Sequence, residues 1–285
     1  MADGRASVRS IFFGTSSVHV TDGMSGILVD GFFSRPSLLR IALGRPIAPD
    51  GGRIRDALSR GGIESLDALF VAHSHYDHVM DSPEIVKGVG GVLFGSKSTV
   101  NVGRGAGLGE QEMRHISDGD KYAFGDFTVQ VLEGVHSPGD RYPGSIDEPL
   151  VPPAKASAYR TGSCYSFLVG HPTGTVLVHP SANFVPNKFH GLDVDVLYLG
   201  IGALGVQSAQ FQDDYWHHTV EAARPDLIIP VHWDDFGRSL SKKLRPMPRI
   251  LDNFAKTKKL LERKSAESGI PVRFQEPYET ITLFS

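Results

Sequence analysis

Four metal-binding side chains stand within six residues of this chain, directly after a short apolar segment. The run reads H-x-H-x-D-H and contributes His73, His75, Asp77 and His78. Imidazole nitrogens bind borderline divalent metals and a carboxylate adds negative charge, so donors at the end of one strand can serve two adjacent ions. The apolar residues 69–72 before the run read as that strand. The chain is therefore expected to fold so that a buried strand delivers this turn to a metal site.

Two further histidines follow strand-like segments later in the chain. Residues 127–132 form a strand-like segment shortly before His136, and the apolar residues 227–231 lead directly to His232. Histidines also cluster by accident in tags and low-complexity tracts, but the sequence around His73 is not repetitive. Recurrence at strand ends favours a metal site assembled from separate parts of the chain.

Strand-like segments alternate with turns and a few helical segments throughout the chain. Strands are predicted over residues 10–13, 26–33, 68–72, 91–94, 121–124, 127–132, 163–169, 175–178, 194–199, 227–231, 272–275 and 280–284. Helices are predicted over residues 54–60, 83–88, 216–223 and 251–268. Both halves are rich in strands first and helices later, which suggests two packed sheets flanked by helices.

Residues 137–162 break this pattern. The segment contains five prolines as well as glycines and charged residues, and it begins directly after His136. Long loops inside a compact domain tend to be functional or disordered. A lid-like loop, or one wall of a substrate site, is therefore expected at about residues 137–162.

Composition sets mild limits on function. The formal net charge is −3, which gives no reason to expect binding to nucleic acid or to an anionic membrane. Cys164 is the single cysteine, so an intrachain disulfide and a cysteine-rich zinc module are both excluded. No stretch approaches the roughly 20 apolar residues that span a bilayer. The N-terminal residues lack the apolar part of a secretory signal, so a cytoplasmic location is expected.

The run from His73 to His78, the later His136, and His232 at the end of a strand together resemble the metallo-β-lactamase superfamily. The resemblance extends over nearly the whole chain, from the turn at Gly14 to His232. It implies an α+β fold in which residues 1–285 form a single four-layer αβ/βα sandwich, with two mixed β-sheets flanked by helices. It does not imply a substrate, because lactonases, thioesterases, phosphodiesterases, nucleases and β-lactamases share these motifs.

The resemblance also implies a ligand set. His73, His75 and His136 would bind one metal ion, and Asp77, His78 and His232 would bind a second. Three protein donors plus water form an open, catalytic type of zinc site. Zinc is the default ion for a histidine-rich site, while manganese, iron and nickel can use the same donors.

One expected residue of this family is missing. Family members commonly carry an aspartate that bridges the two metals just after a strand, and by register Ser181 occupies that place here. A neutral hydroxyl leaves one more positive charge on the site than a carboxylate would, so the second ion is expected to bind more weakly unless another acid compensates, such as Asp30, Asp81, Asp234 or Asp235. Asp30 is either a turn acid or the partner that orients a ligand histidine. A shift of one or two positions in the strand end would instead bring His179 into the site.

Two classes of function are consistent with these residues. The first is a hydrolase in which metal-activated water attacks an ester, a lactone or a related bond of a small molecule, with Asp77 or another protein group assisting proton transfer. A phosphodiesterase or nuclease is the alternative within that class. The second class is a degenerate member that binds metal and a ligand or partner without turnover. The six intact donors favour the enzyme.

Overall fold

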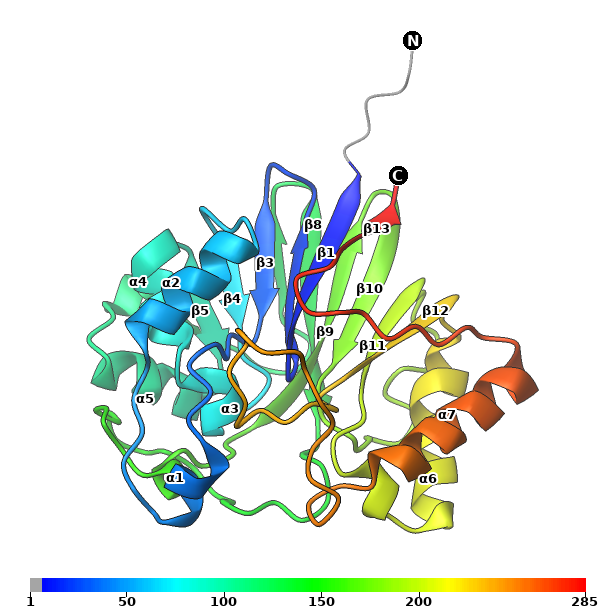
Figure 1. Cartoon of the computed structure of the whole chain (residues 1–285). Helices are drawn as coiled ribbons and strands as arrows, with labels where there is room; N and C mark the ends of the chain where they lie inside the picture. Colours follow the sequence, from blue (N-terminus) through cyan, green and yellow to red (C-terminus); the bar gives the residue numbers. More distant parts are fainter. Residues whose placement is uncertain (1–6) are drawn as a thin grey trace.

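Two mixed β-sheets face each other in the computed structural model, which describes residues 7–285 (Figure 1). The first sheet has seven strands in the order β13-β1-β2-β3-β4-β5-β6. Their bounds are β1 (Val8–Gly14), β2 (Ser17–Thr21), β3 (Gly26–Val29), β4 (Ala68–Phe70), β5 (Val92–Gly95), β6 (Met113–His115) and β13 (Thr280–Phe284). The second sheet has six strands in the order β12-β11-β10-β9-β8-β7. These are β7 (Lys121–Phe124), β8 (Phe127–Gly134), β9 (Cys164–His171), β10 (Gly174–His179), β11 (Val196–Gly200) and β12 (Leu227–Val231).

Both sheets contain a parallel part. Strands β3, β4, β5 and β6 run parallel in the first sheet, as do β10, β11 and β12 in the second. All residues of β4 are buried, which explains why its sequence is continuously apolar rather than alternating. The carboxyl ends of parallel strands meet at one edge of a sheet, so the loops that follow them are gathered there.

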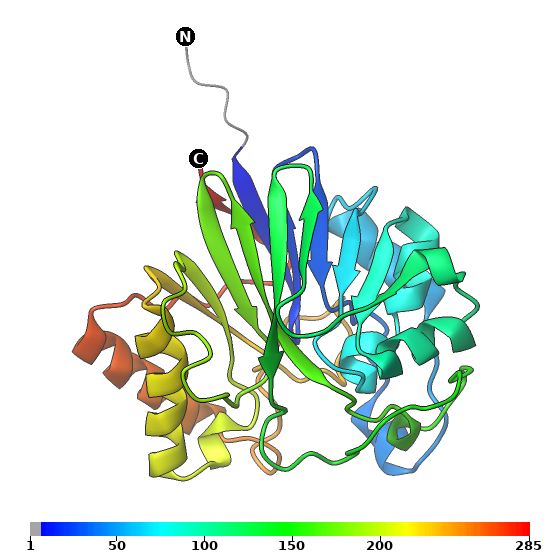
Figure 2. The same cartoon turned by 180° about the vertical axis from the view of Figure 1, so that it is seen from behind.

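Helices cover the outer faces of the two sheets (Figures 1 and 2). On the side of the first sheet lie α2 (Gly51–Arg60), α4 (Ser82–Val89) and α5 (Lys97–Gly105), and on the side of the second lie α6 (Ala209–Trp216) and α7 (Phe254–Ser268). Asp50 begins α2 by accepting hydrogen bonds from the backbone N–H groups of Gly52 and Arg53. The four layers confirm the αβ/βα sandwich implied by the sequence.

The core between the sheets is aromatic around Phe70 of β4. Its ring centroid lies 4.6 Å from that of Phe94 in the same sheet and 5.2 Å from that of Phe167 in the other. Phe70 is fully buried, and its ring packs against both sheets. It lies next to the loop that begins at Val71. The packing of Phe70, the last residue of β4, holds the carboxyl end of this strand in place.

Several element predictions differ from the structure. A helix was expected over residues 216–223, but α6 begins at Ala209 and continues as a π-helical turn over His217–Glu221. Ser208 explains the earlier start, because its side chain accepts a hydrogen bond from the N–H of Phe211. Residues 272–275 form only an isolated bridge between Ile228 and Val272 rather than a strand.

Three helices were not predicted, and one of them, α3 (Tyr76–Val79), is a single turn. The short α1 (Leu38–Ala42) has no buried residue, so it carries no amphipathic signal. The sequence of α5 contains two glycines and three β-branched residues, which are poor helix formers. Its hydrogen-bonding cap at Ser96 and its packing on β5 override that propensity.

Residues 137–162 run as a long loop with one short 3₁₀ turn, Ala156–Ala158. The loop is fastened to α5, because Asn101 donates from Nδ2 to the carbonyl oxygen of Ile146 and Ser98 accepts from the N–H of Ile146. Its two ends meet where the N–H of Thr161 donates to the carbonyl oxygen of Tyr142. The loop therefore has a defined path across one edge of the sandwich.

Within residues 7–285, no helix has both the length and the apolar character needed to cross a bilayer.

We predict that Phe70→Ala lowers the free energy of unfolding by about 3–5 kcal/mol, because it removes a buried ring and leaves a cavity between the sheets. Chemical denaturation followed by circular dichroism measures the loss. Leu39→Ala, at a side chain that is 70% exposed, is the control and should change stability by no more than about 0.5 kcal/mol. Equal effects of the two substitutions would contradict the role given to Phe70.

Candidate metal centre

The predicted donors come from three strand ends at the same edge of the sandwich. The loop after β4 carries His73 and His75 and runs directly into α3 (Tyr76–Val79), a single helical turn that presents Asp77 and His78. His136 follows β8 and His232 follows β12. His232 has a left-handed backbone conformation (φ 61°), and its N–H donates to the carbonyl oxygen of Thr15 at 2.5 Å.

The six side chains form two groups of three. In each group the potential ligand atoms all lie within 4.8 Å of one another, and the groups are His73, His75 and His136, and then Asp77, His78 and His232. The rings of His73 and His78, with centroids 3.8 Å apart, join the two groups. The sequence therefore identified donors that the fold brings together.

Distances within the second group suit a shared cation better than direct hydrogen bonds. His232 Nε2 lies 3.4 Å from Asp77 Oδ2 and 3.3 Å from His78 Nε2, and His78 Nε2 lies 3.7 Å from Asp77 Oδ2. In the first group, both ring nitrogens of His73 are buried and have no hydrogen-bond partner among residues 7–285. Since an unpartnered buried polar atom costs stability, these donors fit a divalent metal ion.

The outer nitrogen of each of three ligand rings is held by a hydrogen bond. His78 donates from Nδ1 to Asp30 Oδ2 at 2.7 Å, and His136 donates from Nδ1 to the carbonyl oxygen of Ser137 at 2.8 Å. His75 Nε2 lies 3.0 Å from Thr161 Oγ1 and 3.2 Å from Asp140 Oδ1. These contacts fix the rings and leave the opposite nitrogen of each free to face the site.

Asp30 is the buried partner that orients His78. Its Oδ2 also accepts from Ser16 Oγ at 2.6 Å, and its Oδ1 accepts from the N–H of Ala72 at 2.8 Å. Asp30 thus joins the end of β3 to the loop that carries the first two histidines. Of the two readings of Asp30, the structure supports the orienting role.

The pKa shifts of His73, His136 and Asp77 favour the protonation states that bind metal; for His78, burial alone would lower the pKa, but the charges of Asp30 and Asp77 raise it. Burial, with a smaller effect of neighbouring His78, lowers the pKa of His73 well below its ordinary value. Burial and the nearby His75 lower the pKa of His136 to about 4. Burial alone would raise the pKa of Asp77, but the charges of His78 and His232 hold it below its usual range. Neutral imidazoles and an ionised carboxylate are the forms that coordinate a cation.

Ser181 and His179 lie in different surroundings. Ser181 lines the same pocket as His73, His136 and His232. His179 does not line that pocket: it donates from Nε2 to the carbonyl oxygen of Asn183 and accepts at Nδ1 from Ser166. Of the two positions considered, Ser181 therefore lies at the pocket, whereas both ring nitrogens of His179 are engaged elsewhere.

His179 nevertheless supports the centre indirectly. It fixes the turn that contains Asn183, whose Nδ2 donates to the carbonyl oxygen of His136 at 2.7 Å. The N–H of Ala182 donates to Ser137 Oγ in the same turn. The turn after β10 and the turn after β8 are thus tied together.

The other acids considered for the bridging place have structural roles. Asp81 accepts hydrogen bonds from the N–H groups of Phe33 and Ser34 and from the Ser34 hydroxyl. Asp234 forms a fully buried ion pair with Arg35 at 2.6 Å. Neither Asp81, Asp234 nor Asp235 lines the metal pocket.

Two acids near the cluster were missed by the sequence reasoning. Asp140 faces His75 and accepts a hydrogen bond from Thr161, and its place four residues after His136 could have signalled it. Asp252 lines the pocket with His232, and burial raises its pKa. Nothing in the local sequence marks Asp252, which follows an irregular loop.

The pocket above the donors has a volume of about 500 Å³ and a largely apolar wall. Its lining includes Leu38 and Ile41 of α1 together with Phe236, Met247 and Leu251. The start of the long loop, including Arg141 and Tyr142, also lines it. Residues 137–139 and 141–142 of the loop therefore contribute to the lining of the pocket.

Comparison with known proteins gives the centre a family context. A family model described as a beta-lactamase superfamily domain matches residues 11–232. The UPF0173 metal-dependent hydrolase of Heliobacterium modesticaldum is 25% identical over 233 residues, which cover 79% of this chain and 82% of that protein.

Two solved structures share the fold. Igni18, a metallo hydrolase from the archaeon Ignicoccus hospitalis, is 17% identical, with a TM-score of 0.61 over 96% of this chain and 97% of that one. CmlA, a diiron β-hydroxylase from Streptomyces venezuelae, is 16% identical, with a TM-score of 0.62 over 98% of this chain and 54% of that one.

We predict that Asp30→Asn weakens metal binding by about 10- to 100-fold, because an amide cannot serve His78 and the N–H of Ala72 as the carboxylate does. Titration of the metal-free protein against a competing chelator measures the affinity. The control is Asp50→Asn, at the exposed start of α2, which should leave the affinity unchanged. Unaltered binding in a folded Asp30→Asn protein would exclude the orienting role.

Proposed function

The chain belongs to the metallo-β-lactamase superfamily, and from this premise we propose that it is a hydrolase that cleaves an ester, a lactone or a related bond in a small molecule. Metal-dependent hydrolysis accords with its relatives, among them the Heliobacterium protein named a metal-dependent hydrolase. The single observation that carries the proposal is the pair of three-residue donor groups at one edge of the sandwich, open to a pocket of small-molecule size.

The donor groups define the proposed metal sites. His73, His75 and His136 would hold one divalent ion, and Asp77, His78 and His232 a second. When bound, such a pair lowers the pKa of a water molecule and polarises the electrophile. We propose zinc as the ion, since histidine predominates among the donors, while manganese, iron and nickel suit the same atoms.

The chain's own side chains would position the substrate and handle protons. Asp77 is held ionised by its neighbours and can orient or accept a proton in the site. Burial raises the pKa of Tyr76, which lines the pocket, so its hydroxyl stays protonated and can donate to a developing oxyanion. Arg141, also in the lining, offers a positive charge to an anionic part of the substrate.

The wall of the pocket favours a substrate with an apolar body. Leu38, Ile41, Phe236 and Met247 present hydrocarbon to the cavity, whereas Arg141 is the one arginine or lysine that residues 7–285 contribute to its lining. A nucleic acid would need a track of several cations along its phosphates. An acyl ester or lactone with an apolar chain matches this wall better than a phosphodiester does.

The neutral Ser181 in the pocket supports one second candidate, a member that binds metal and ligand without turnover. The two candidates differ in whether any substrate is consumed. A panel of ester, lactone and phosphodiester substrates, tested on protein loaded with zinc or manganese, separates them. Faster hydrolysis of apolar esters or lactones supports the proposal, whereas a panel with no turnover favours the binding protein.

We predict that His75→Ala abolishes hydrolysis of whichever panel substrate is accepted and lowers the metal content, because it removes a direct donor. His217→Ala is the matched histidine control. This side chain is 64% exposed, and within residues 7–285 its one ion-pair partner is Glu221. Metal analysis and rate measurements on both variants test the assignment. Loss of metal from the His217→Ala protein would show that the ligands are assigned wrongly.

We also predict that Ser181→Asp raises affinity for the second ion, because a carboxylate would remove one positive charge from the site and add a donor. Zinc titration of the metal-free parent and variant is the measurement. The hydrolysis rate need not rise with the metal affinity, since a metal that binds more tightly can hold the nucleophile in the wrong position for the substrate. If second-site affinity does not rise, Ser181 does not face the metals.

A further inference from the structure

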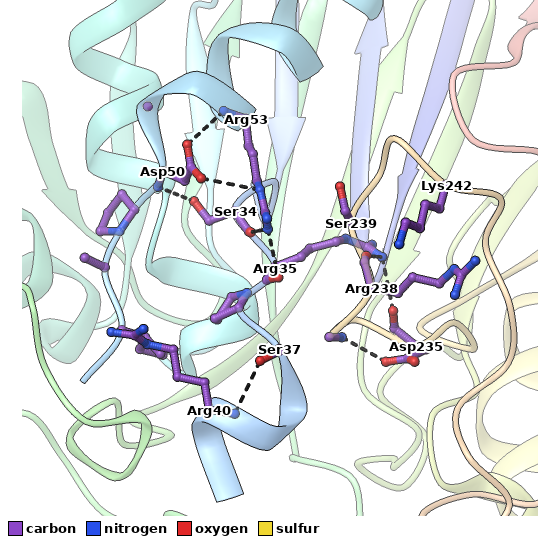
Figure 3. A pocket seen from close by; sticks show the side chains of 16 residues that line it. Ser34, Arg35, Ser37, Arg40, Asp50, Arg53, Asp235, Arg238, Ser239 and Lys242 are labelled. Carbon is purple, nitrogen blue, oxygen red and sulfur yellow. Dashed lines mark hydrogen bonds and ion pairs between the residues drawn. The ribbon is translucent and has the colours of Figure 1, made fainter. Parts of the chain in front are cut away.

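A second hollow lies behind the wall of the metal pocket and shares no lining residue with it. Its volume is about 910 Å³. We call it the basic recess, after the arginine and lysine residues of its lining, which are Arg35, whose side chain is buried, and Arg40, Arg53, Arg238 and Lys242. Figure 3 shows them around an open space, with Arg40 and Arg53 on the side of α1 and α2 and Arg238 and Lys242 on the facing loop.

Positive charge dominates the basic recess although the whole chain has a net charge of −3. The lining contains two carboxylates, Asp50 and Asp235, against the five cations. Arg35 is also neutralised from outside the lining by Asp234, at 2.6 Å. Even with that ion pair counted, cationic groups exceed acids around the hollow, so a bound anion would relieve their mutual repulsion.

Three arginines are held in place through main-chain carbonyl oxygens. Arg40 donates from Nε to Pro46 at 2.8 Å, Arg53 from Nη1 to Ser34 at 2.5 Å, and Arg238 from Nε to Lys243 at 3.1 Å. Because carbonyl oxygens carry no net charge, these bonds orient the guanidinium groups without cancelling their charge. Because these guanidinium groups are already oriented, a ligand that binds them loses less free energy to ordering the side chains.

The two acids of the recess are already engaged. Asp50 accepts from the N–H groups of Gly52 and Arg53 at the start of α2, and its Oδ2 lies 3.4 Å from Arg53 Nε. Asp235 accepts from the N–H of Gly237 at 3.0 Å. Within residues 7–285, no hydrogen bond or ion pair from the Nη atoms of Arg40, the Nη atoms of Arg238 or Lys242 Nζ is present. These donors are free for a ligand.

We propose that the basic recess binds a small phosphorylated molecule. Guanidinium groups match phosphate oxygens in pairs, and cations on two facing walls suit a group with more than one negative charge. The volume exceeds that of a single phosphate, and Pro36, Ala48 and Pro49 add apolar surface for the organic part of the ligand. The proposal of a phosphate site does not rest on the hydrolysis proposed for the metal pocket.

Occupancy of the recess would act on the metal pocket through a shared wall. Ser37 and Arg40 face the recess, while Leu38 and Ile41 of the same segment line the metal pocket. On the opposite loop Phe236 lines the metal pocket and Gly237 the recess, and Gly237 packs tightly against Leu38. A ligand that joins Arg40 to Arg238 would therefore brace α1 against this loop.

Inorganic phosphate, titrated calorimetrically into the metal-loaded protein, is the probe. Arg40→Gln combined with Lys242→Gln should weaken its binding by about tenfold or more, because charge-assisted hydrogen bonds are lost. Lys258→Gln combined with Lys259→Gln removes the same charge from α7 and should leave binding unchanged. Ser239→Glu, which keeps both cations but adds a negative charge to the lining, should also weaken binding.

Phosphate bound to the metal centre is distinguished by His75→Ala, which removes a proposed metal ligand but leaves the recess intact. The proposal requires that this variant retains phosphate binding. It is overturned if His75→Ala abolishes binding while both recess variants bind normally, or if the parent protein binds no phosphate. Succinate is the carboxylate comparison, and binding as tight as that of phosphate would contradict a phosphate site.

Discussion

Burying five imidazoles and a carboxylate in one small volume is the constraint on which this structure depends. Each group loses its hydration, and the loss is tolerable only where the group gains a hydrogen bond or a cation. The outer nitrogens of His75, His78 and His136 have such partners, whereas neither nitrogen of His73 has one in the described part of the chain. The inner face of the cluster is left for metal, which is why the donors can remain so close together.

The partners of the ligands come from the scaffold rather than from the ligand loops alone. Asp30, at the end of β3, binds both the ring of His78 and the backbone at Ala72. The segment after β12 is held by the buried Arg35–Asp234 pair and by Thr15, whose N–H donates to Asp234 and whose carbonyl oxygen accepts from the N–H of His232. The metal centre is therefore assembled by contacts between the first sheet and the loops of the second. Breaking the Arg35–Asp234 pair would leave an uncompensated buried charge, which costs several kcal/mol.

The sequence predicted the parts of the fold and site that depend on local pattern. The apolar run before His73 is β4, and the histidines converge because β4, β8 and β12, from two different sheets, all end at the same edge of the sandwich. Contacts between segments far apart in the sequence produce no local sequence pattern, so they could not be predicted. Asp252 reaches the pocket from an irregular loop, and the β-branched residues and glycines of α5 conceal a helix that forms by packing and capping. The hydrogen bonds of His179 to Ser166 and Asn183 could not be predicted, because these partners lie on segments whose approach only the folded chain reveals.

Anomalous X-ray diffraction from crystals of the protein purified without added metal or chelator tests the central claim most directly. At the absorption edge of the bound element, the account predicts a strong peak about 2.0–2.1 Å from ligand nitrogens of His73, His75 and His136 if that element is zinc. A second peak, weaker because Ser181 supplies no bridging charge, is predicted beside Asp77, His78 and His232. A metal that occupies some other part of the chain, with both donor groups empty, would contradict the account.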